Sequence, residues 1–226
     1  MNATADLPET NSPRRVFLVD DHPLVREWLT NLIHQQKDLT VCGEAEEAPA
    51  ALRAIERLQP DAAVVDVTLA NGSGIELVKD LKRVAPKVAV VVLSMHDETL
   101  YAERALRAGA RGYVMKRETT RKVIAALREV LEGRLYVSEE FRASLAEKFI
   151  EGKTGGSSVD QLSDRELEVF RQLGQGHETR RIAESLGISI KTVQVYCARI
   201  KEKLSLANAT ELLREAMRWW ESQNGS

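Results

Sequence analysis

The feature that most constrains the fold of this chain is a regular alternation between short apolar runs and segments with helical spacing. The apolar runs are nearly continuous and rich in β-branched residues, which is typical of parallel strands buried on both faces. In the segments between them, apolar residues recur at helical intervals, as in amphipathic helices. This alternation predicts a doubly wound α/β domain with a five-stranded parallel sheet. The predicted strands are residues 15–20, 39–45, 62–66, 88–94 and 112–116.

The alternation stops after Gly133, and the segments that follow have helical spacing only. Residues 152–158, with the sequence GKTGGSS, have the composition of a flexible linker. We expect a second, all-α domain with four helices, which begins at a capping box formed by Ser163 and Glu166. The expected division is a disordered leader (1–14), an α/β domain (15–136), an interdomain helix and linker (137–160) and the helical domain (161–226).

Composition and the cysteine positions argue against a membrane-spanning, secreted or cysteine-ligated metal protein. The chain has 226 residues, enough for two domains, and its net charge of −2 does not mark the whole chain as nucleic-acid binding. Cys42 and Cys197 lie far apart without metal-type spacing, so we expect reduced thiols. The longest apolar run (88–95) is shorter than the roughly 20 residues that span a bilayer. The N-terminus lacks the features of a signal peptide, and we therefore expect a cytoplasmic protein.

Chemically distinctive residues stand where the predicted strands end. Functional groups of doubly wound sheets gather at these carboxyl ends. Clustered acids can hold a hard cation such as Mg²⁺, and the metal and a lysine would neutralise a carboxylate nucleophile and an incoming phosphoryl group. Each residue alone is a common turn, cap or surface residue, but their order along the strands favours phosphoryl transfer to Asp66. The set is Asp20 and Asp21 after the first strand, Asp66 after the third, Ser94 after the fourth and Lys116 after the fifth.

Four stretches of the α/β domain resemble the flavodoxin-like receiver domain of two-component response regulators. They read LVDDHPLVRE, VVDVTLANGSGIEL, VVVLSMHDE and RAGARGYVMK. The resemblance implies that Asp66 accepts a phosphoryl group from a histidine kinase. It also implies that Asp20 and Asp21 hold Mg²⁺ together with Asp66, and that the backbone carbonyl of Thr68 completes the protein ligands.

The resemblance further implies a pair of switch residues, Ser94 and Tyr113. The hydroxyl of Ser94 would move toward the phosphoryl group, and the ring of Tyr113 would rotate inward behind it. The alternative for Tyr113 is an ordinary core aromatic residue. Two prolines that are common in receivers are absent, since Ala70 and Arg117 occupy their positions. A proline would stiffen the loop at Ala70, so its absence leaves that loop freer.

The second domain contains a helix, a turn at Gly187 and a longer helix, which predicts a helix-turn-helix. Residues 190–204 contain four basic residues and one acidic residue, whereas residues 161–226 contain ten basic and nine acidic residues. The basic helix is either a solvated surface or a DNA-reading element, and the turn before it favours DNA. Val193, Ile200 and Leu204 can face the core. The candidate DNA contacts are Lys191, Thr192, Gln194, Val195, Tyr196, Arg199, Lys201 and Lys203.

The sequences LSDRELEVF and IAESLGISIKTV resemble the LuxR-type DNA-binding domain, and the whole chain resembles the NarL/FixJ response regulators. The resemblance implies a regulator of transcription that is controlled by phosphorylation, binds double-stranded DNA and pairs as a homodimer. Trp219 and Trp220, in the helix that pairs in this family, could pack within the domain or across a dimer. The positions that depart from the family pattern are Thr179, Arg181, Gln194 and Tyr196.

Two alternatives remain open. The chain could be a protein-interaction module with little DNA binding, or a regulator that does not depend on phosphorylation. An enzyme that acts on an external substrate is not expected, because the strand-end loops contain no insertions that would build a substrate pocket.

Overall fold

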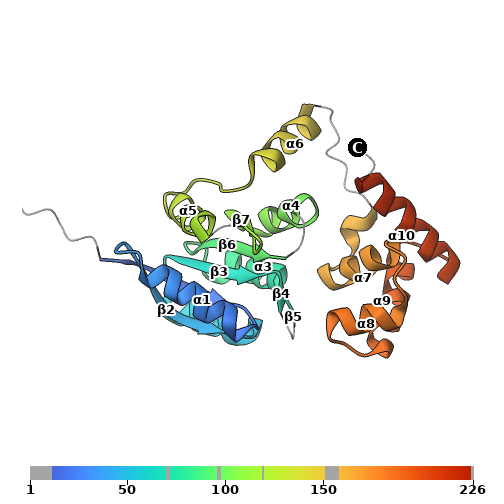
Figure 1. The fold of residues 1–226 in the computed structure, drawn as a ribbon, viewed down its shortest axis with the longest axis horizontal. Coiled ribbons are helices and arrows are strands. Elements are labelled where there is room, and N and C mark those ends of the chain that lie inside the picture. Colours follow the sequence, from blue (N-terminus) through green and yellow to red (C-terminus); the bar gives the residue numbers. More distant parts are fainter. Residues whose placement is uncertain (1–11, 70–71, 96–97, 119, 151–157, 225–226) are drawn as a thin grey trace, which may run out of the picture. The chain divides into compact units, whose positions relative to one another are not determined.

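The computed structural model describes residues 12–69, 72–95, 98–118, 120–150 and 158–224. The chain separates into two compact units, Met1–Glu147 and Lys148–Ser226 (Figure 1). Most of the expected leader, the expected linker sequence up to residue 157 and Ala70 lie outside the described residues. Among the helices described, none combines the length and the apolar character needed to cross a membrane.

Within the described part of the first unit, five parallel strands form one sheet in the order β2-β1-β3-β6-β7. The predicted doubly wound α/β fold is therefore confirmed, with strand positions that differ from the expected ones by a residue at most at each end. The strands are β1 (Arg14–Val19), β2 (Leu39–Ala45), β3 (Ala62–Asp66), β6 (Ala89–Ser94) and β7 (Gly112–Met115). The helices are α1 (Pro23–His34), α2 (Ala48–Leu58), α3 (Gly74–Val84), α4 (Glu98–Ala108) and α5 (Thr120–Leu131).

Helices cover both faces of this sheet because side chains alternate along each strand. Val16 and Leu18 of β1 point into a core that includes residues of α1 and α5. Phe17, between them, points to the other face, where it packs against Gly43 beside Leu58 of α2. On that face α2 lies next to α3, and α3 lies next to α4.

A small hairpin that the sequence did not predict follows β3. It consists of β4 (Thr68–Leu69) paired antiparallel with β5 (Gly72–Ser73). The hairpin returns the chain so closely that a Cβ on Gly74 would lie 1.8 Å from the carbonyl oxygen of Asp66. Only glycine fits there, and Ser73 caps the first turn of α3 by accepting the Ile75 amide. The close approach fixes the start of α3 against the end of β3.

The second unit is helical, as predicted. A 3₁₀ turn over Ser158–Gln161 precedes α7 (Asp164–Gly174), α8 (Thr179–Leu186), α9 (Ile190–Lys203) and α10 (Ala209–Asn224). A further helix, α6 (Glu139–Ile150), lies between α5 and this turn.

Local signals in the sequence explain the boundaries of these helices. The capping box of Ser163 and Glu166 is present at the start of α7. Gly187 ends α8 in the left-handed region at φ 63°, and Ser189 caps α9 by accepting the Thr192 amide. In α10, the ring of Trp219 lies 5.6 Å from that of Phe170 in α7, so this tryptophan packs within its own unit.

Candidate functional site

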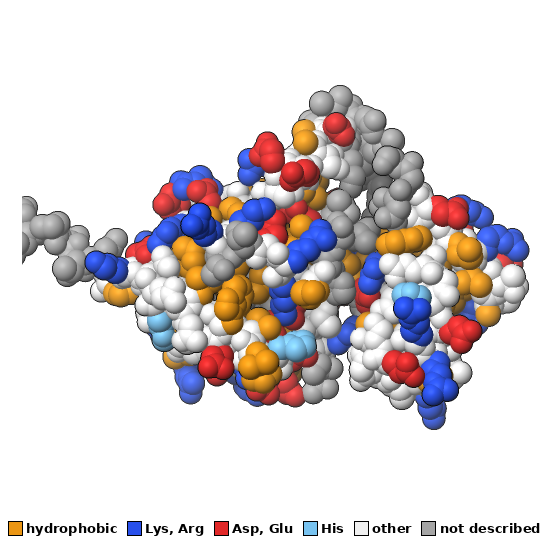
Figure 2. Space-filling view, viewed as in Figure 1, with side chains coloured by type: hydrophobic (Ala, Val, Ile, Leu, Met, Phe, Trp, Pro, Cys, Tyr) orange, Lys and Arg blue, Asp and Glu red, His pale blue; other side chains and the backbone are white. Residues whose placement is uncertain are grey.

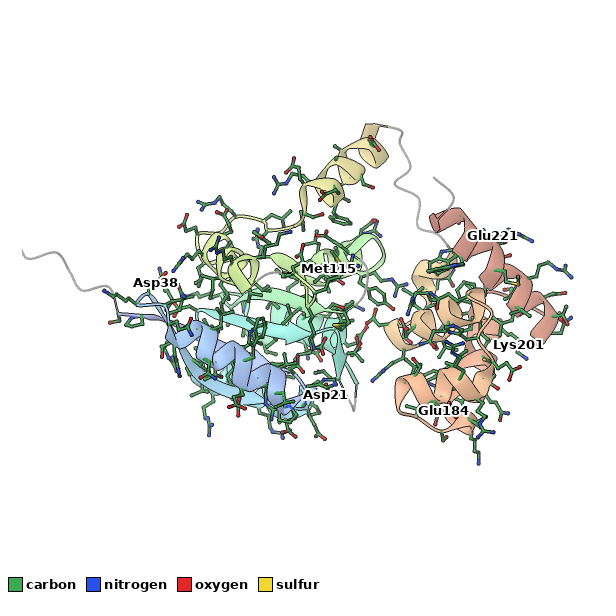
Figure 3. The ribbon with its side chains drawn as sticks, viewed as in Figure 1. Asp21, Asp38, Met115, Glu184, Lys201 and Glu221 are labelled. Atoms are coloured by element: carbon green, nitrogen blue, oxygen red, sulfur yellow. The ribbon has the colours of Figure 1, made fainter. Side chains whose placement is uncertain are left out.

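The predicted strand-end residues all belong to one end of the sheet. Figure 3 shows Asp21 and Met115 at this end and Asp38 at the opposite end. The carboxyl ends of parallel strands point the same way, so residues from distant parts of the sequence meet here. These residues are Asp20 directly after β1, Asp66 at the end of β3, Ser94 at the end of β6 and Lys116 directly after β7.

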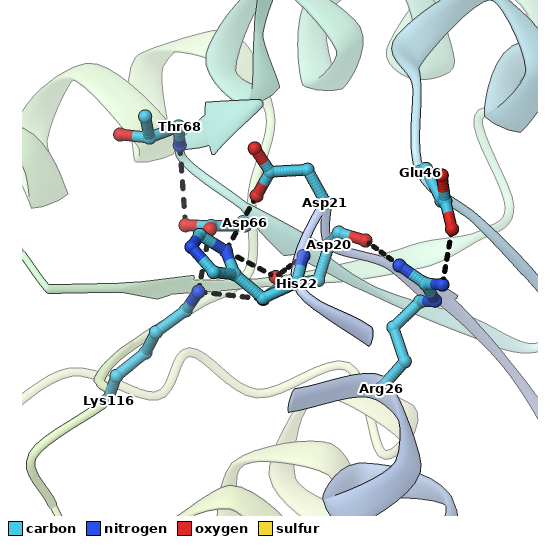
Figure 4. A network of polar contacts seen from close by, with 8 residues as sticks. All are labelled: Asp20, Asp21, His22, Arg26, Glu46, Asp66, Thr68 and Lys116. Atoms are coloured by element: carbon cyan, nitrogen blue, oxygen red, sulfur yellow. Dashed lines mark hydrogen bonds and ion pairs between the residues drawn. The ribbon is translucent and has the colours of Figure 1, made fainter. Parts of the chain in front are cut away.

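Lys116 connects the acids of two strands (Figure 4). Its Nζ donates to Asp20 Oδ2 at 2.7 Å and to Asp66 Oδ2 at 2.6 Å. The side chains of Asp20 and Asp66 are 2% and 5% exposed, and that of Lys116 is 11% exposed. The three charges therefore interact where water screens them weakly.

The negative charges of this cluster outnumber its positive charge. Burial raises the pKa of Asp66 to about 6; Lys116 opposes this rise, and the neighbouring Asp20 adds to it. Burial lowers the pKa of Lys116, but its two carboxylate partners outweigh burial and raise that pKa overall. One lysine thus serves two buried carboxylates, and the site favours a further positive charge.

The same residues suit a divalent cation. Asp20, Asp21, His22 and Asp66 each offer one ligand atom, and these atoms lie within 4.8 Å of one another. Asp21 Oδ1 is buried and has no hydrogen-bond donor among the described residues; His22 Nδ1 lies 2.7 Å away, outside hydrogen-bond geometry. An oxygen-rich cluster with excess negative charge fits a hard ion such as Mg²⁺.

Two other predicted residues, Thr68 and Ser94, are bonded to residues of this cluster. The Thr68 amide donates to Asp66 Oδ1 at 3.3 Å. Ser94 is fully buried, and its carbonyl accepts the Lys116 amide at 2.7 Å. Tyr113 is 1% exposed, which is the burial of a core aromatic residue. Arg117, in place of a common proline, is exposed.

In the second unit, the exposed side of α9 contains a shallow depression of about 350 Å³. Of the three predicted core residues, Val193 and Ile200 are fully buried, whereas Leu204 is only half-buried, as is Cys197. Lys and Arg side chains are interspersed with Asp and Glu on the visible face of this unit (Figure 2). Residues that line the depression are Ser189, Lys191, Thr192, Val195, Tyr196 and Arg199.

Comparisons with known proteins agree with both units. The profile of the response regulator receiver domain matches residues 16–128, and that of the bacterial regulatory proteins of the luxR family matches residues 160–216. Response regulator GacA of Pseudomonas aeruginosa is 33% identical over 204 residues, which cover 90% of this chain and 95% of GacA. The chain belongs to the NarL/FixJ response regulators.

Further relatives cover both domains of this response regulator. The transcriptional regulatory protein UhpA of Escherichia coli K12 is 35% identical over 206 residues, or 91% of this chain and 98% of UhpA. RcsB of Salmonella enterica serovar Typhimurium, in a structure bound to promoter rprA with phosphomimetic beryllofluoride, is 28% identical. Its TM-score is 0.56, over 89% of this chain and 97% of that chain.

Two residues near the acids of the receiver domain were missed by sequence reasoning, namely His22, described above with the candidate metal ligands, and Arg26. Arg26, buried in α1, donates from Nη1 to the carbonyl of Asp20 at 2.7 Å and from Nη2 to Glu46 at 2.6 Å (Figure 4). It fastens the turn that carries Asp20 and Asp21. The sequence offered one indication of this role, since Arg26 stands in the first turn of the helix that follows the acid pair.

The LuxR-type domain places one candidate apart from the others. Lys203 Nζ donates to Glu166 Oε2 at 2.6 Å, and the Glu166 side chain is 3% exposed. Burial raises the pKa of Glu166, but Lys203 and Ser163 outweigh burial and hold the pKa below its usual value. Lys203, whose side chain is 39% exposed, is therefore bonded within its own domain, and Lys191, Gln194 and Arg199 are exposed as well.

Proposed function

We propose that Asp66 is the residue through which this response regulator is phosphorylated by a histidine kinase. The observation that carries the proposal is the shared lysine: Lys116 bonds both Asp66 and Asp20, and the cluster still favours a cation. Asp20, Asp21, Asp66 and the backbone carbonyl of Thr68 would hold Mg²⁺. The ion supplies positive charge that offsets the repulsion between a carboxylate and a phosphoryl group.

In this reaction a carboxylate oxygen of Asp66 forms a bond to phosphorus, while the bond from phosphorus to the kinase histidine breaks. The electron pair of that bond leaves with the imidazole. Lys116 Nζ is already beside Asp66 Oδ2 and stabilises the negative charge of the transferred group. The Ser94 hydroxyl would donate to another phosphoryl oxygen and draw the ring of Tyr113 inward.

We propose that phosphorylation favours pairing and thereby promoter binding. RcsB, 28% identical, was solved on promoter DNA with a phosphomimetic, which supports this order of events. Two copies bind a pair of half-sites, and a second contact raises the overall affinity without new protein–DNA chemistry. We further propose that the chain acts in the cytoplasm and as a regulator rather than as an enzyme on an external substrate.

The exposed side of α9 is the proposed DNA-reading surface. Gln194 and Arg199 would contact base edges, and Val195, which is 43% exposed, would contact a thymine methyl group. Lys191 and Thr192 stand in the first turn of α9, where backbone amides and a basic side chain suit phosphate. Tyr196 and Lys201 complete the surface, while Lys203 is held by Glu166.

The first test is labelling with acetyl phosphate and Mg²⁺. The Asp66→Asn variant should lose labelling altogether, because the amide is a poor nucleophile. The Asp80→Asn variant, at a half-exposed carboxylate on α3, should be labelled like the unchanged protein. Labelling of Asp66→Asn at one stoichiometric site would refute the assignment.

The second test is promoter binding. Arg199→Ala should weaken binding by about 1–3 kcal/mol if the guanidinium reads a base, and Lys201→Ala should weaken all sequences equally. Arg83→Ala, at an exposed arginine of the receiver domain, is the control that should change nothing. Affinity that does not respond to salt would favour the protein-interaction module instead.

The third test is sedimentation with beryllofluoride and Mg²⁺. The mass in solution should rise toward that of a dimer for the unchanged chain but not for Asp66→Asn. An equal mass with and without beryllofluoride would show that pairing is independent of the acid site.

A further inference from the structure

The chain that joins α5 to α6 is bonded to the edge of the receiver sheet. We refer to residues 134–138 as the connector. The Tyr136 amide donates to the Arg111 carbonyl at 2.9 Å, and the Tyr113 amide donates to the Tyr136 carbonyl at 2.9 Å. Tyr136 thus forms a parallel bridge with Gly112 of β7. The connector is an extension of the sheet beside Tyr113, one of the two proposed switch residues.

A second bond ties the connector to α4. Glu98 Oε1 accepts the Ser138 amide at 2.8 Å, across 40 positions of the sequence. Glu98 is the first residue of α4 and is only 6% exposed. Carboxylates are rarely buried unless a specific partner holds them, and bonds to ionised acceptors are stronger than neutral ones.

Ser138 is also the residue from which α6 starts. Its hydroxyl accepts the Phe141 amide at 3.0 Å, and its carbonyl accepts the Arg142 amide at 3.0 Å. Val137 and Phe141, on either side of it, are 5% and 3% exposed. Any shift of Glu98 therefore acts on the residue that caps α6, the helix that leads to the LuxR-type domain.

Both proposed switch residues are connected to this cap. Glu98 follows Ser94 by four positions, so a displacement of Ser94 toward a phosphoryl group pulls on the segment that begins α4. Tyr113 is bonded to the connector through its own amide. Packed elements of this kind change between discrete arrangements rather than by gradual deformation.

We infer that the bond between Glu98 and Ser138 is a latch through which the state of Asp66 controls the cap of α6. Phosphorylation changes the position of Glu98, and the Ser138 amide loses or regains its acceptor. The N-terminal turn of α6 is released or held accordingly, which alters how the LuxR-type domain is presented. The inference rests on the proposed phosphorylation of Asp66 and names the contact that transmits it.

The direct test is amide hydrogen exchange at Ser138 in the full-length chain. Beryllofluoride with Mg²⁺ should change that exchange rate by about tenfold, the factor expected for one bond to a charged acceptor. The Arg15 amide is a matched control, because it also donates to a distant carboxylate, Asp61, at 2.7 Å. Its exchange should stay constant. An unchanged rate at Ser138 under full beryllofluoride occupancy would overturn the latch.

Two variants at Glu98 test the coupling itself. Glu98→Ala removes the acceptor, and Glu98→Gln keeps an oxygen in the same place. Both should be labelled by acetyl phosphate at the rate of the unchanged chain, because Glu98 belongs to neither the metal nor the phosphoryl contacts. The gain in DNA affinity on adding beryllofluoride should fall at least several-fold in Glu98→Ala and be largely retained in Glu98→Gln.

A matched control and the opposing outcomes complete the design. Asp61→Ala removes the comparable bond to Arg15 and should keep the full gain in DNA affinity. A full gain in Glu98→Ala, with normal labelling, would overturn the latch and leave the role of Asp66 intact. Labelling that survives Asp66→Asn would instead contradict the proposed function.

Discussion

Each domain contains a buried acid paired with a lysine, and the two pairs behave oppositely. Lys116 Nζ lies 2.6 Å from Asp66 Oδ2 in the receiver domain, and Lys203 Nζ lies 2.6 Å from Glu166 Oε2 in the LuxR-type domain. The pKa of Asp66 is nevertheless raised to about 6, whereas that of Glu166 is lowered. The distance between the ammonium nitrogen and the carboxylate oxygen therefore does not by itself determine whether the pKa of the acid is raised or lowered.

The surroundings of each carboxylate account for the difference. Asp66 is strongly desolvated and shares its lysine with Asp20. Glu166 has Lys203 to itself and also accepts the Ser163 amide at 2.7 Å within the capping box. A carboxylate whose bonds are complete stabilises a fold, while one short of positive charge is prepared for a ligand.

The largest expected effect is a gain of stability on removing the charge of Asp66. The folded pKa of about 6 exceeds the unfolded value of 3.8, so the free energy of unfolding falls as pH rises through this window. Without metal, the Asp66→Asn substitution should therefore raise the free energy of unfolding by about 3 kcal/mol at pH 8 and change it little at pH 4. Urea denaturation in EDTA measures this. If the Asp66→Asn variant were less stable than the unchanged chain at pH 8, the conclusion that the ionised Asp66 destabilises the metal-free receiver would be wrong.

Glu166→Gln should have the opposite sign. The amide keeps the shape but loses charge-assisted bonds to Lys203 and Ser163, which costs about 2 kcal/mol at pH 7. The folded pKa of Glu166 is lowered, so this stabilisation is present above the unfolded value of 4.5 and is lost as pH falls through the folded one. Tryptophan fluorescence, in a Trp28→Phe background, reports unfolding of the LuxR-type domain. Equal stability at pH 7 would mean that the pair is not structural.

Mg²⁺ should stabilise one domain and not the other. At about ten times its dissociation constant, an ion that binds only the folded receiver adds about 1.4 kcal/mol to its free energy of unfolding. Thermal unfolding with and without Mg²⁺ should show this shift for the receiver transition and none for the LuxR-type domain. The shift should be reduced in Arg26→Met, because Arg26 holds the turn that carries Asp20 and Asp21. A shift in both domains would indicate a general salt effect.

The smallest effect is expected for an exposed pair that serves as the reference. Arg180 and Glu184 are one helical turn apart on α8, with side chains 79% and 68% exposed. Arg180→Ala should lower the free energy of unfolding by only about 0.3–0.5 kcal/mol, since water and salt screen the pair. Urea denaturation at low and high salt measures it. A loss as large as that of Glu166→Gln would show that burial does not separate the two classes.

The sequence was sufficient to predict much of the acid site. Asp20, Asp66 and Lys116 could be placed together because the carboxyl ends of parallel strands meet at one end of a sheet. The helix boundaries in the LuxR-type domain were equally local, since Ser163, Gly187 and Ser189 act on adjacent backbone groups.

Contacts between side chains of different elements were not predictable in this way. Lys203 looked like an exposed basic residue of α9, but its ammonium group bonds Glu166 of α7. Arg26 and Glu98 have ordinary positions in amphipathic helices, and only packing shows that both are buried with specific partners. Helical spacing predicts which face of the helix a residue occupies, but it does not predict which atom of another element the side chain contacts.

The sequence by itself determined the alternation of the five parallel strands with helices, the helix-turn-helix and the set of residues that gathers at the strand ends. These follow from periodicity, caps and turns, which act between neighbours in the chain. Only the tertiary structure decided that Lys116 serves Asp20 and Asp66 together and that Glu98 holds Ser138, bonds that join residues 96, 50 and 40 positions apart. Such bonds depend on how helices pack on the sheet, because packing sets the distance between side chains that the sequence leaves unrelated.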